Sequence, residues 1–299
     1  MNILLTGGTG FIGSYLSLKL LKEGHALTII TRSPLKYNAE AAHNRRYVSW
    51  DSDLSTHMDW ADVVINLVGE NLFGKRWTET VKERLYHSRI DNTEKLVKAI
   101  EEAESRPNLM ISASAVGYYG DTGDRVVDED DPPGDDFLAQ LCDAWEKAAH
   151  PVRDFGVRLA TPRLGVVLED DGGALDQMVL PFKLFAGGPV GSGEQYIPWV
   201  HMRDLCDALA FPIWNETFSG PYNIAAPHPA TMNELAHEIG RQLNRPSWLR
   251  VPEFAVRLAL GEAAEPVLFS INVDSKKLRE AGFTFEYSHV DEALADILR

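Results

Sequence analysis

The chain has 299 residues, of which 44% are hydrophobic and 24% are charged, and its formal net charge is −15. These proportions are ordinary for a globular protein, and the length suffices for a full α/β core with a second lobe. The acidic balance argues against a duplex nucleic-acid partner, because phosphate backbones are bound by clustered Lys and Arg. The two cysteines, Cys142 and Cys206, lie far apart without metal-ligand spacing, so we expect a cytoplasmic protein.

A membrane partner is not expected either. The first apolar run, at about residues 3–6, is too short for a signal segment and suits a strand. No uninterrupted apolar stretch approaches the roughly 20 residues that a bilayer-spanning helix needs.

The amino-terminal segment is the most informative part of the sequence. An apolar run at residues 2–6 predicts a strand, and a helical pattern begins directly after a glycine-rich turn. Glycines three residues apart permit a tight turn, close approach of the backbone to a diphosphate at the helix N-terminus, and close packing of helix on strand. A glycine-rich turn without a ligand is the alternative. The residues that we assign to this dinucleotide site are Gly7, Gly8, Thr9, Gly10, Phe11, Ile12 and Gly13.

Strand and helix patterns alternate through the first half of the chain. Such alternation predicts an α/β fold with a doubly wound parallel sheet of the Rossmann type. The predicted strands span residues 2–6, 25–31, 46–49, 63–68, 109–112 and 156–168. The predicted helices span residues 13–23, 78–104 and 137–149.

The end of the second strand decides which dinucleotide is expected. A carboxylate there would bind the ribose 2′-hydroxyl and repel a 2′-phosphate. The strand instead ends in Thr31, Arg32 and Ser33. A guanidinium forms bidentate, charge-assisted contacts with a phosphate, and the hydroxyls add donors. We therefore expect NADP(H) rather than NAD(H), with an exposed surface arginine as the alternative for Arg32.

Residues 121–136 carry eight acidic side chains and a Pro-Pro-Gly sequence. A solvated surface loop on the active-site side and a metal site are the two interpretations. The carboxylates do not follow the spacing of a calcium loop, so we expect the solvated loop and assign no metal.

The second half of the chain changes character. Residues 170–193 are rich in glycine with interspersed apolar residues, which suits ordered loops around a short helix beside a pocket. Thr231 and Glu234 form a capping-box pattern that opens a helix ending before Pro246. A last helix is predicted at about residues 290–298.

These patterns predict two lobes packed together. The dinucleotide-binding domain spans residues 1–168, with return elements at about 196–226. Residues 169–195 and 227–299 form a smaller, C-terminal, substrate-side lobe.

Several later motifs, together with the glycine turn, resemble those of the short-chain dehydrogenase/reductase superfamily. The likeness is to the extended, nucleotide-sugar-epimerase-like branch, and within it to the YfcH-type epimerase family. Residues 251–283 resemble the C-terminal extension of that group, so the resemblance covers essentially the whole chain. The other motifs that carry it are residues 66–70, 88–89, 112–120, 187–193 and 199–204.

This resemblance implies further cofactor contacts. A loop would pass under the adenosine and the diphosphate, two helix arginines would face the cofactor, and a segment just past a strand would border the nicotinamide. Surface salt bridges are the alternative for the arginines. The residues are Leu67, Val68 and Gly69 in the loop, Arg84 and Arg89 on the helix, Ser112 at a strand end, and Val167 at the nicotinamide border.

The chemistry that the resemblance implies needs a Ser, a Tyr, and a Lys four residues after the Tyr. On a helix this spacing puts the last two side chains on one face, where the ammonium lowers the pKa of the phenol. Ser114 fits the Ser position, with a hydroxyl that satisfies backbone at a strand end as the alternative. The helix at 137–149 instead has Phe137 for the Tyr, and Leu141 or Cys142 for the Lys. The usual Tyr–Lys pair is therefore absent.

Two tyrosines remain as candidate catalytic residues beside Ser114. Tyr118 and Tyr119 follow it by about one turn, and either would place a phenol in the site, with aromatic packing as the alternative. His201 and Asp204 lie at the start of a helix, where we expect a capping or structural pair rather than an acid/base dyad.

The sequence thus predicts an NADP(H)-binding oxidoreductase, or an epimerase and hence an isomerase, of the extended type. Its substrate would be a small molecule such as a nucleotide sugar. A catalytically reduced NADP(H)-binding protein that senses redox state or regulates a partner is the second hypothesis. The missing Tyr–Lys pair favours that hypothesis, and the glycine-rich segment at 187–193 favours an enzyme. The sequence specifies neither the substrate, the reaction direction nor the oligomeric state.

Overall fold

A parallel sheet forms the centre of the computed structural model, which describes residues 1–72 and 75–298. Its strand order is β12-β8-β5-β4-β1-β2-β3, and the short β6 also pairs with β8. The order reverses between β1 and β4, the point at which such sheets bind ligands. The bounds are β1 Asn2–Thr6, β2 Ala26–Thr31, β3 Arg45–Ser49, β4 Val63–Asn66, β5 Leu109–Ser112, β6 Ser114–Ala115, β8 Arg158–Leu164 and β12 Gly220–Ile224.

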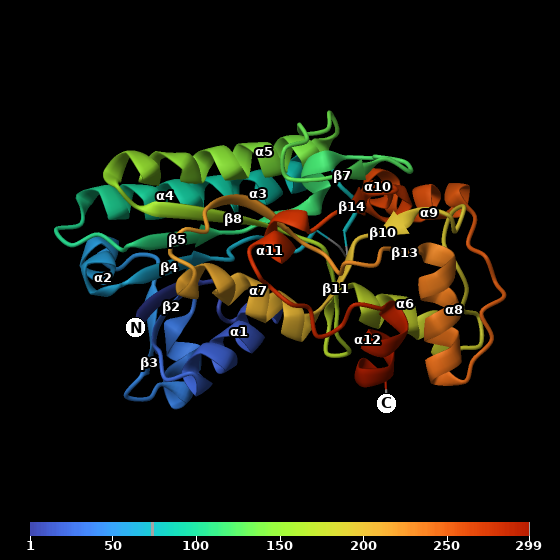
Figure 1. Cartoon of the computed structure of the whole chain (residues 1–299), viewed down its shortest axis with the longest axis horizontal. Coiled ribbons are helices and arrows are strands. Elements are labelled where there is room, and N and C mark those ends of the chain that lie inside the picture. Colours follow the sequence, from blue (N-terminus) through green and yellow to red (C-terminus); the bar gives the residue numbers. More distant parts are fainter. Residues whose placement is uncertain (73–74, 299) are drawn as a thin grey trace.

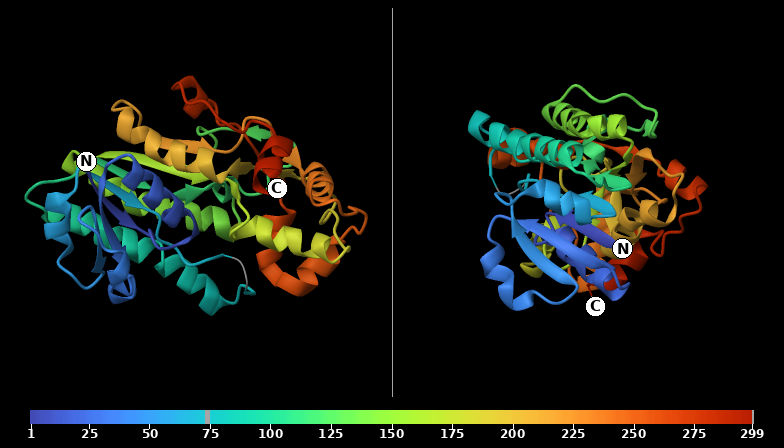
Figure 2. Two further views of the ribbon diagram at one scale, coloured as in Figure 1. Left: turned by 90° about the horizontal axis from the view of Figure 1, so that it is seen from below. Right: turned by 90° about the vertical axis from the view of Figure 1, so that its left-hand side faces the viewer.

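Helices cover both faces of this sheet (Figures 1 and 2). Helices α1 and α7 lie on one face, and α2, α4 and α5 lie on the other, with α3 preceding α4. Their bounds are α1 Phe11–Lys22, α2 Leu54–Trp60, α3 Glu79–His87, α4 Ile90–Glu102, α5 Phe137–Ala149 and α7 Met202–Trp214.

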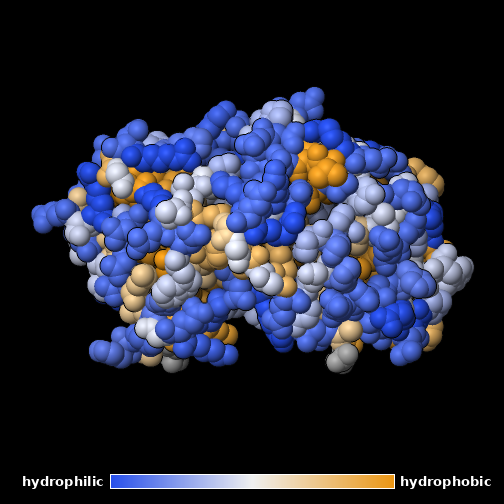
Figure 3. All heavy atoms as spheres, in the orientation of Figure 1, coloured by the Kyte–Doolittle hydropathy of each residue, from blue (hydrophilic) through white to orange (hydrophobic). Residues whose placement is uncertain are grey.

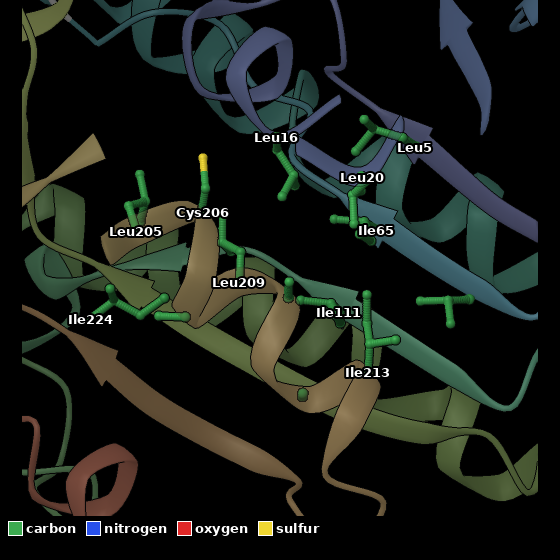
Figure 4. Packing of buried hydrophobic residues seen from close by; sticks show 14 of the residues in the cluster. Leu5, Leu16, Leu20, Ile65, Ile111, Leu205, Cys206, Leu209, Ile213 and Ile224 are labelled. Atoms are coloured by element: carbon green, nitrogen blue, oxygen red, sulfur yellow. The ribbon is translucent and has the colours of Figure 1, made fainter. Parts of the chain in front are cut away.

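The apolar side chains of the strands alternate between these two faces, as a sheet buried on both sides requires. On β1, Ile3 and Leu5 pack in the cluster shared with α1 and α7, whereas Leu4 packs in the cluster shared with α4. Figure 4 shows part of the first cluster, in which side chains of α1 and α7 meet those of the strands. It labels Leu5, Leu16, Leu20, Ile65, Ile111, Leu205, Cys206, Leu209, Ile213 and Ile224.

A second lobe lies beyond the carboxyl ends of the strands (Figure 1). Its core comes mainly from α6, α8 and α12, which bury residues such as Phe182, Leu235 and Leu294. The helices are α6 Gly173–Lys183, α8 Met232–Leu243, α9 Glu253–Leu260, α10 Glu265–Leu268, α11 Lys276–Glu280 and α12 Val290–Ile297. The short strands form the pairs β7 Val126–Val127 with β14 Asn272–Val273, β9 Val166–Leu168 with β11 Trp199–His201, and β10 Tyr196–Ile197 with β13 Ala230–Thr231. Short 3-10 helices span η1 Pro34–Glu40, η2 Val116–Tyr119, η3 His150–Phe155 and η4 Gly261–Ala264.

Much of the predicted element pattern is confirmed. Strands β1 and β5 and helix α5 have the predicted bounds, and β12 returns to the sheet beside β8. The predicted capping box is present, because the Thr231 hydroxyl accepts from the Glu234 N–H while the Glu234 carboxylate accepts from the Thr231 N–H. The exact division into lobes stays a prediction.

The single helix predicted over residues 78–104 is wrong, because the chain forms α3 and α4 with a bend at Ser88 and Arg89. The Ser88 hydroxyl accepts from the Glu70 N–H at 3.1 Å and donates to the Leu85 carbonyl at 3.0 Å. The contact between Ser88 and the loop at Glu70 holds the bend. Helical periodicity in the sequence does not predict such a contact.

The strand predicted over residues 156–168 is also interrupted. It forms β8 and β9 with Gly165 between them. A Cβ on Gly165 would lie 2.3 Å from the Pro198 carbonyl oxygen, so the crossing of another segment sets the break.

No helix within residues 1–72 and 75–298 is long and apolar enough to cross a membrane. The face in Figure 3 is mostly hydrophilic, with small scattered apolar areas.

The expected capping role of His201 is confirmed. It is the N-cap of α7, and its buried Nδ1 accepts from the Arg203 N–H at 3.1 Å. The Asp204 carboxylate accepts from the N–H groups of Glu286 and Tyr287, at 2.7 and 2.9 Å, so it ties α7 to the C-terminal segment. Both residues hold structure together.

The cap predicts a pH dependence of stability. Burial lowers the pKa of His201 below its ordinary value of 6.5, and a cap through Nδ1 needs the neutral ring. The unfolded chain therefore binds the proton more tightly, so this contribution to stability is complete above about pH 6.5 and is lost as the pH falls below it. We expect His201→Asn, which caps without titrating, to lose less thermal stability than the parent between pH 7.5 and 5.5. Equal losses in thermal melts would contradict this role.

Candidate functional site

Two glycines bring three pieces of backbone together where the strand order reverses. Gly7 has φ +70°, and a Cβ on it would lie 2.6 Å from the Leu67 carbonyl oxygen. A Cβ on Gly13 would lie 2.2 Å from the Gly7 carbonyl oxygen. Only glycine therefore lets the loop after β4 and helix α1 both pack on this turn. Of the other turn residues, Gly8 is buried and Thr9 is exposed.

The amino end of α1 offers free hydrogen-bond donors. Its cap residue is the exposed Gly10, which provides no side-chain cap, and its first turn has no acidic residue. Within the described residues, the N–H groups of Phe11, Ile12 and Gly13 have no acceptor, whereas that of Ser14 donates to the Gly10 carbonyl. A dinucleotide diphosphate fits this donor set, because its oxygens would satisfy these groups at the positive end of the helix dipole.

Thr31 ends β2 beside this turn, since Thr6 of β1 is in register with Ile30 of β2. Thr31 is buried, and its hydroxyl accepts from the Ser33 N–H at 3.5 Å. Arg32 and Ser33 are exposed. In the part of the chain that the structure describes, the Arg32 guanidinium makes no hydrogen bond or ion pair, so it is available to a ligand phosphate.

A buried amide fixes the loop that crosses the turn. Asn66, at the end of β4, accepts from the Thr6 hydroxyl at 2.7 Å and donates to Thr93 at 2.9 Å and to Ser112 at 3.2 Å. Its Oδ1 also accepts from the Val68 N–H at 3.4 Å. Ser112, predicted to bind the cofactor, is fully buried in this network and thus fixes strand ends and loop.

The two predicted helix arginines also hold this loop, whose Gly69 is exposed. Arg89 is buried and donates to the Glu70 carbonyl at 3.0 Å and to the Leu85 carbonyl at 3.1 Å. A Cβ on Gly69 would lie 3.0 Å from the Arg89 guanidinium carbon. Arg84 lies 3.3 Å from the Glu70 carboxylate in a partly exposed ion pair. Arg89 therefore positions the backbone of this loop through its hydrogen bond to the Glu70 carbonyl, and its role toward a cofactor stays a prediction.

A buried ion pair lies where β6 runs beside the end of β8. Ser114 is in register with Arg163, and its hydroxyl donates to Glu146 Oε1 at 2.7 Å. Arg163 donates to the two carboxylate oxygens of Glu146 at 2.9 and 3.0 Å. Both side chains of the pair are almost fully buried. The Ser114 hydroxyl thus bonds to a carboxylate of α5 and not to backbone. Val167, which was predicted at the nicotinamide border, lies on β9 and is partly buried.

The two candidate tyrosines meet the same guanidinium in different ways. Tyr119 is buried; its hydroxyl donates to Asn223 Oδ1 at 2.7 Å and accepts from Arg163 at 2.9 Å. Tyr118 is half-buried, and the Arg163 guanidinium carbon lies 3.5 Å from its ring centroid. Burial raises the pKa of both phenols, and Arg163 opposes that rise. Both tyrosines are therefore protonated at neutral pH.

Apolar groups fill the positions on α5 that the resemblance would give to Tyr and Lys. The Phe137 ring packs on Trp77 with centroids 5.4 Å apart, and Leu141 lies in a buried apolar cluster. Burial raises the pKa of the Cys142 thiol to about 12, so it stays neutral at physiological pH.

The acidic segment at 121–136 is only partly solvated. Its β7 pairs with β14 of the C-terminal lobe, and the Glu129 carboxylate accepts from the Asn223 N–H at 2.8 Å. No group of three or more potential metal-binding side chains occurs among the described residues.

No sequence motif predicted Glu146 or Arg163 as members of this site. The available signals were an arginine within the apolar strand pattern at 159–164 and a glutamate directly after Trp145 on the buried side of α5. Neither belongs to a motif with a fixed spacing, and only the tertiary structure joins them.

The chain is similar to known proteins over its whole length. Residues 3–140 match the NAD dependent epimerase/dehydratase family, and residues 251–297 match a domain of unknown function, DUF1731. The chloroplastic epimerase family protein SDR39U1 homolog of Arabidopsis thaliana is 39% identical over 100% of this chain and 87% of its own. The epimerase family protein YfhF of Bacillus subtilis is 37% identical over 100% of this chain and 98% of its own.

Solved structures share the Rossmann-like α/β fold. The human epimerase family protein SDR39U1, in a crystal structure with NADPH, is 34% identical, has a TM-score of 0.92, and is matched over 100% of this chain and 99% of that chain. A nucleoside-diphosphate sugar epimerase from Corynebacterium glutamicum is 31% identical with a TM-score of 0.79, over 100% of this chain and 58% of that chain.

The buried ion pair predicts a large stability effect. Glu146→Ala leaves the Arg163 guanidinium buried without its carboxylate, so we expect a loss of about 3–5 kcal/mol of unfolding free energy, measured by urea denaturation. Glu238→Ala is the matched control, because Glu238 accepts in the same way from Arg241, whose side chain is 56% exposed. We expect that control to lose about 1 kcal/mol or less. Equal losses would mean that the Glu146–Arg163 pair contributes no more than a surface pair.

Proposed function

Because the chain belongs to the epimerase family, we propose that it binds NADP(H) and acts as an oxidoreductase or epimerase on a small polar substrate. The observation that carries the proposal is the turn at Gly7–Gly13, with its free N–H groups beside the unpaired Arg32. The human relative crystallised with NADPH supports the choice of dinucleotide.

In this proposal, different segments of the chain bind different parts of NADP(H). The α1 donors would hold the diphosphate, and Arg32 would pair with the 2′-phosphate, with Thr31 and Ser33 beside it. The loop 67–69, which Asn66 holds from below, would pass along the adenosine side. When bound, NADP(H) supplies hydride transfer at its nicotinamide ring.

Tyr118 is the proton donor that the geometry favours. The hydroxyl protons of Ser114 and Tyr119 are already donated to Glu146 and Asn223. Among the described residues, no protein acceptor takes the Tyr118 hydroxyl proton, and its side chain is partly exposed. Its raised pKa keeps the phenol protonated, which suits donation to a substrate carbonyl and hence the reductive direction.

The second hypothesis, a redox sensor or regulator, is favoured by a specific observation. Two of the three candidate hydroxyls are already donating within the buried network, and α5 has no ammonium at the expected position. NADP(H) binding without turnover would fit this arrangement.

A nucleotide sugar is one proposed substrate, because the 31% identical Corynebacterium relative is described as a nucleoside-diphosphate sugar epimerase. The MoeE5 structure with UDP-glucose and NAD is 20% identical, with a TM-score of 0.80 over 100% of this chain and 97% of that chain, and supports the fold alone. A cytoplasmic location stays a prediction.

Arg32→Ala tests the cofactor assignment. Loss of a charge-assisted phosphate contact should weaken NADPH binding by about tenfold or more and leave NADH binding nearly unchanged, as measured by titration calorimetry. Lys22→Ala is the matched control, because it removes one exposed positive charge from the far end of α1. Equal effects of Arg32→Ala on both coenzymes would remove Arg32 from the site.

Turnover distinguishes the two functions. We expect NADPH fluorescence to fall when one member of a panel of nucleotide sugars, aldehydes and quinones is added, because that substrate accepts hydride. Tight NADPH binding with no oxidation by any member would favour the sensor. No binding of either coenzyme would contradict both hypotheses.

A further inference from the structure

The Arg163 guanidinium contacts both candidate catalytic tyrosines, Tyr118 and Tyr119. Arg163 comes from the end of β8, its guanidinium carbon lies 3.5 Å from the Tyr118 ring centroid, and its Nη1 donates to the Tyr119 hydroxyl. The side chain is 3% exposed, so water screens its charge very little. A buried cation over the face of a phenol holds the ring and favours negative charge on it.

Glu146 fixes this guanidinium. Its two oxygens accept from Nε and Nη2 of Arg163, and Oε1 also accepts from the Ser114 hydroxyl. The carboxylate comes from α5, the helix that would carry Tyr and Lys in the usual arrangement. One ion pair therefore connects Ser114, Tyr118 and Tyr119.

We propose that Arg163 and Glu146 are positioning residues of the reductive site: Arg163 supplies the buried positive charge that α5 lacks, and Glu146 orients Arg163 and Ser114. This proposal rests on the proposed function, because it takes Tyr118 as the proton donor. The cation reaches the phenol from β8, so no Lys four residues after a Tyr is needed.

The proposed step reduces a substrate carbonyl to an alcohol. The substrate carbonyl carbon gains a hydride with both its electrons from the reduced nicotinamide coenzyme, which is thereby oxidised. The Tyr118 O–H bond breaks, and its proton forms the new O–H bond of the alcohol. The phenolate that remains faces Arg163 and regains a proton from water.

Besides burial, which raises the pKa of Tyr118 most, charged groups on α5 and β8 shift this pKa in opposite directions. Glu146 and Asp143 of α5 raise the pKa of Tyr118, and Arg163 of β8 lowers it. Lys147 of α5 also interacts electrostatically with Tyr118. Because Arg163 and Glu146 carry opposite charges, removing each charge alone should move the pKa in opposite directions.

The first test measures the ionisation of the phenol at position 118 and needs no substrate turnover. 3-Fluorotyrosine is placed at position 118, and its ionisation is followed by fluorine NMR during a pH titration of the full chain. We expect Arg163→Met to raise the pKa at position 118 by about one unit and Glu146→Gln to lower it. The pair of changes Glu238→Gln and Arg241→Met, which removes a similar ion pair from α8, should leave it unchanged.

Either single change can unfold the chain, since each leaves a buried charge unpaired. The combined variant Glu146→Met with Arg163→Met removes both charges and avoids that penalty. In it we expect the pKa at position 118 to rise, because Arg163 is the stronger of the two influences. An unchanged pKa in this folded variant would overturn the electrostatic role of Arg163.

The second test separates this proposal from the proposed function. We expect Tyr118→Phe and the combined Met variant each to lower kcat by about 100-fold while the NADPH dissociation constant stays within about twofold of the parent. Arg163→Lys should recover part of kcat, because it restores the charge. Full activity of Tyr118→Phe with normal NADPH binding would overturn the proposal and leave the cofactor assignment standing. If the unaltered chain did not bind NADPH, that result would instead overturn the proposed function.

Discussion

The structure depends on the close approach of backbone at the first turn. Helix α1, strand β1 and the loop after β4 meet there with no room for a Cβ atom on Gly7 or Gly13. This contact sets the amino end of α1 at the point where the strand order reverses, and it leaves the first N–H groups of the helix without acceptors. The proposed binding site is thus a consequence of how tightly helix, strand and loop pack.

Two buried polar networks extend this arrangement along the carboxyl ends of the strands. Asn66 joins β1, β4 and β5 and fixes the loop above them. The Arg163–Glu146 pair joins β8 to α5, with both tyrosines at its guanidinium and Ser114 at its carboxylate. Burial makes these contacts strong and also makes a missing partner costly, so the networks hold their members in one arrangement.

Membership of the epimerase family is compatible with an unusual set of residues on α5. The chain shares its whole length with epimerase family proteins, yet α5 presents Phe137 and apolar neighbours where the resemblance would put Tyr and Lys. A cation in the same region comes instead from a strand, held by a carboxylate from that helix. A buried cation is therefore present near α5 although the helix itself has no Tyr–Lys motif.

The sequence by itself determined what depends on near neighbours in the chain: the glycine turn, the parallel α/β pattern, the bounds of β1, β5 and α5, the Thr231 capping box and the His201 cap. Only the tertiary structure decided the bend at Ser88, the break at Gly165, the use of Arg89 to hold a loop, and the meeting of Glu146 with Arg163. Local periodicity and turn chemistry act within a few residues, whereas these contacts join segments that approach only after the sheet has formed.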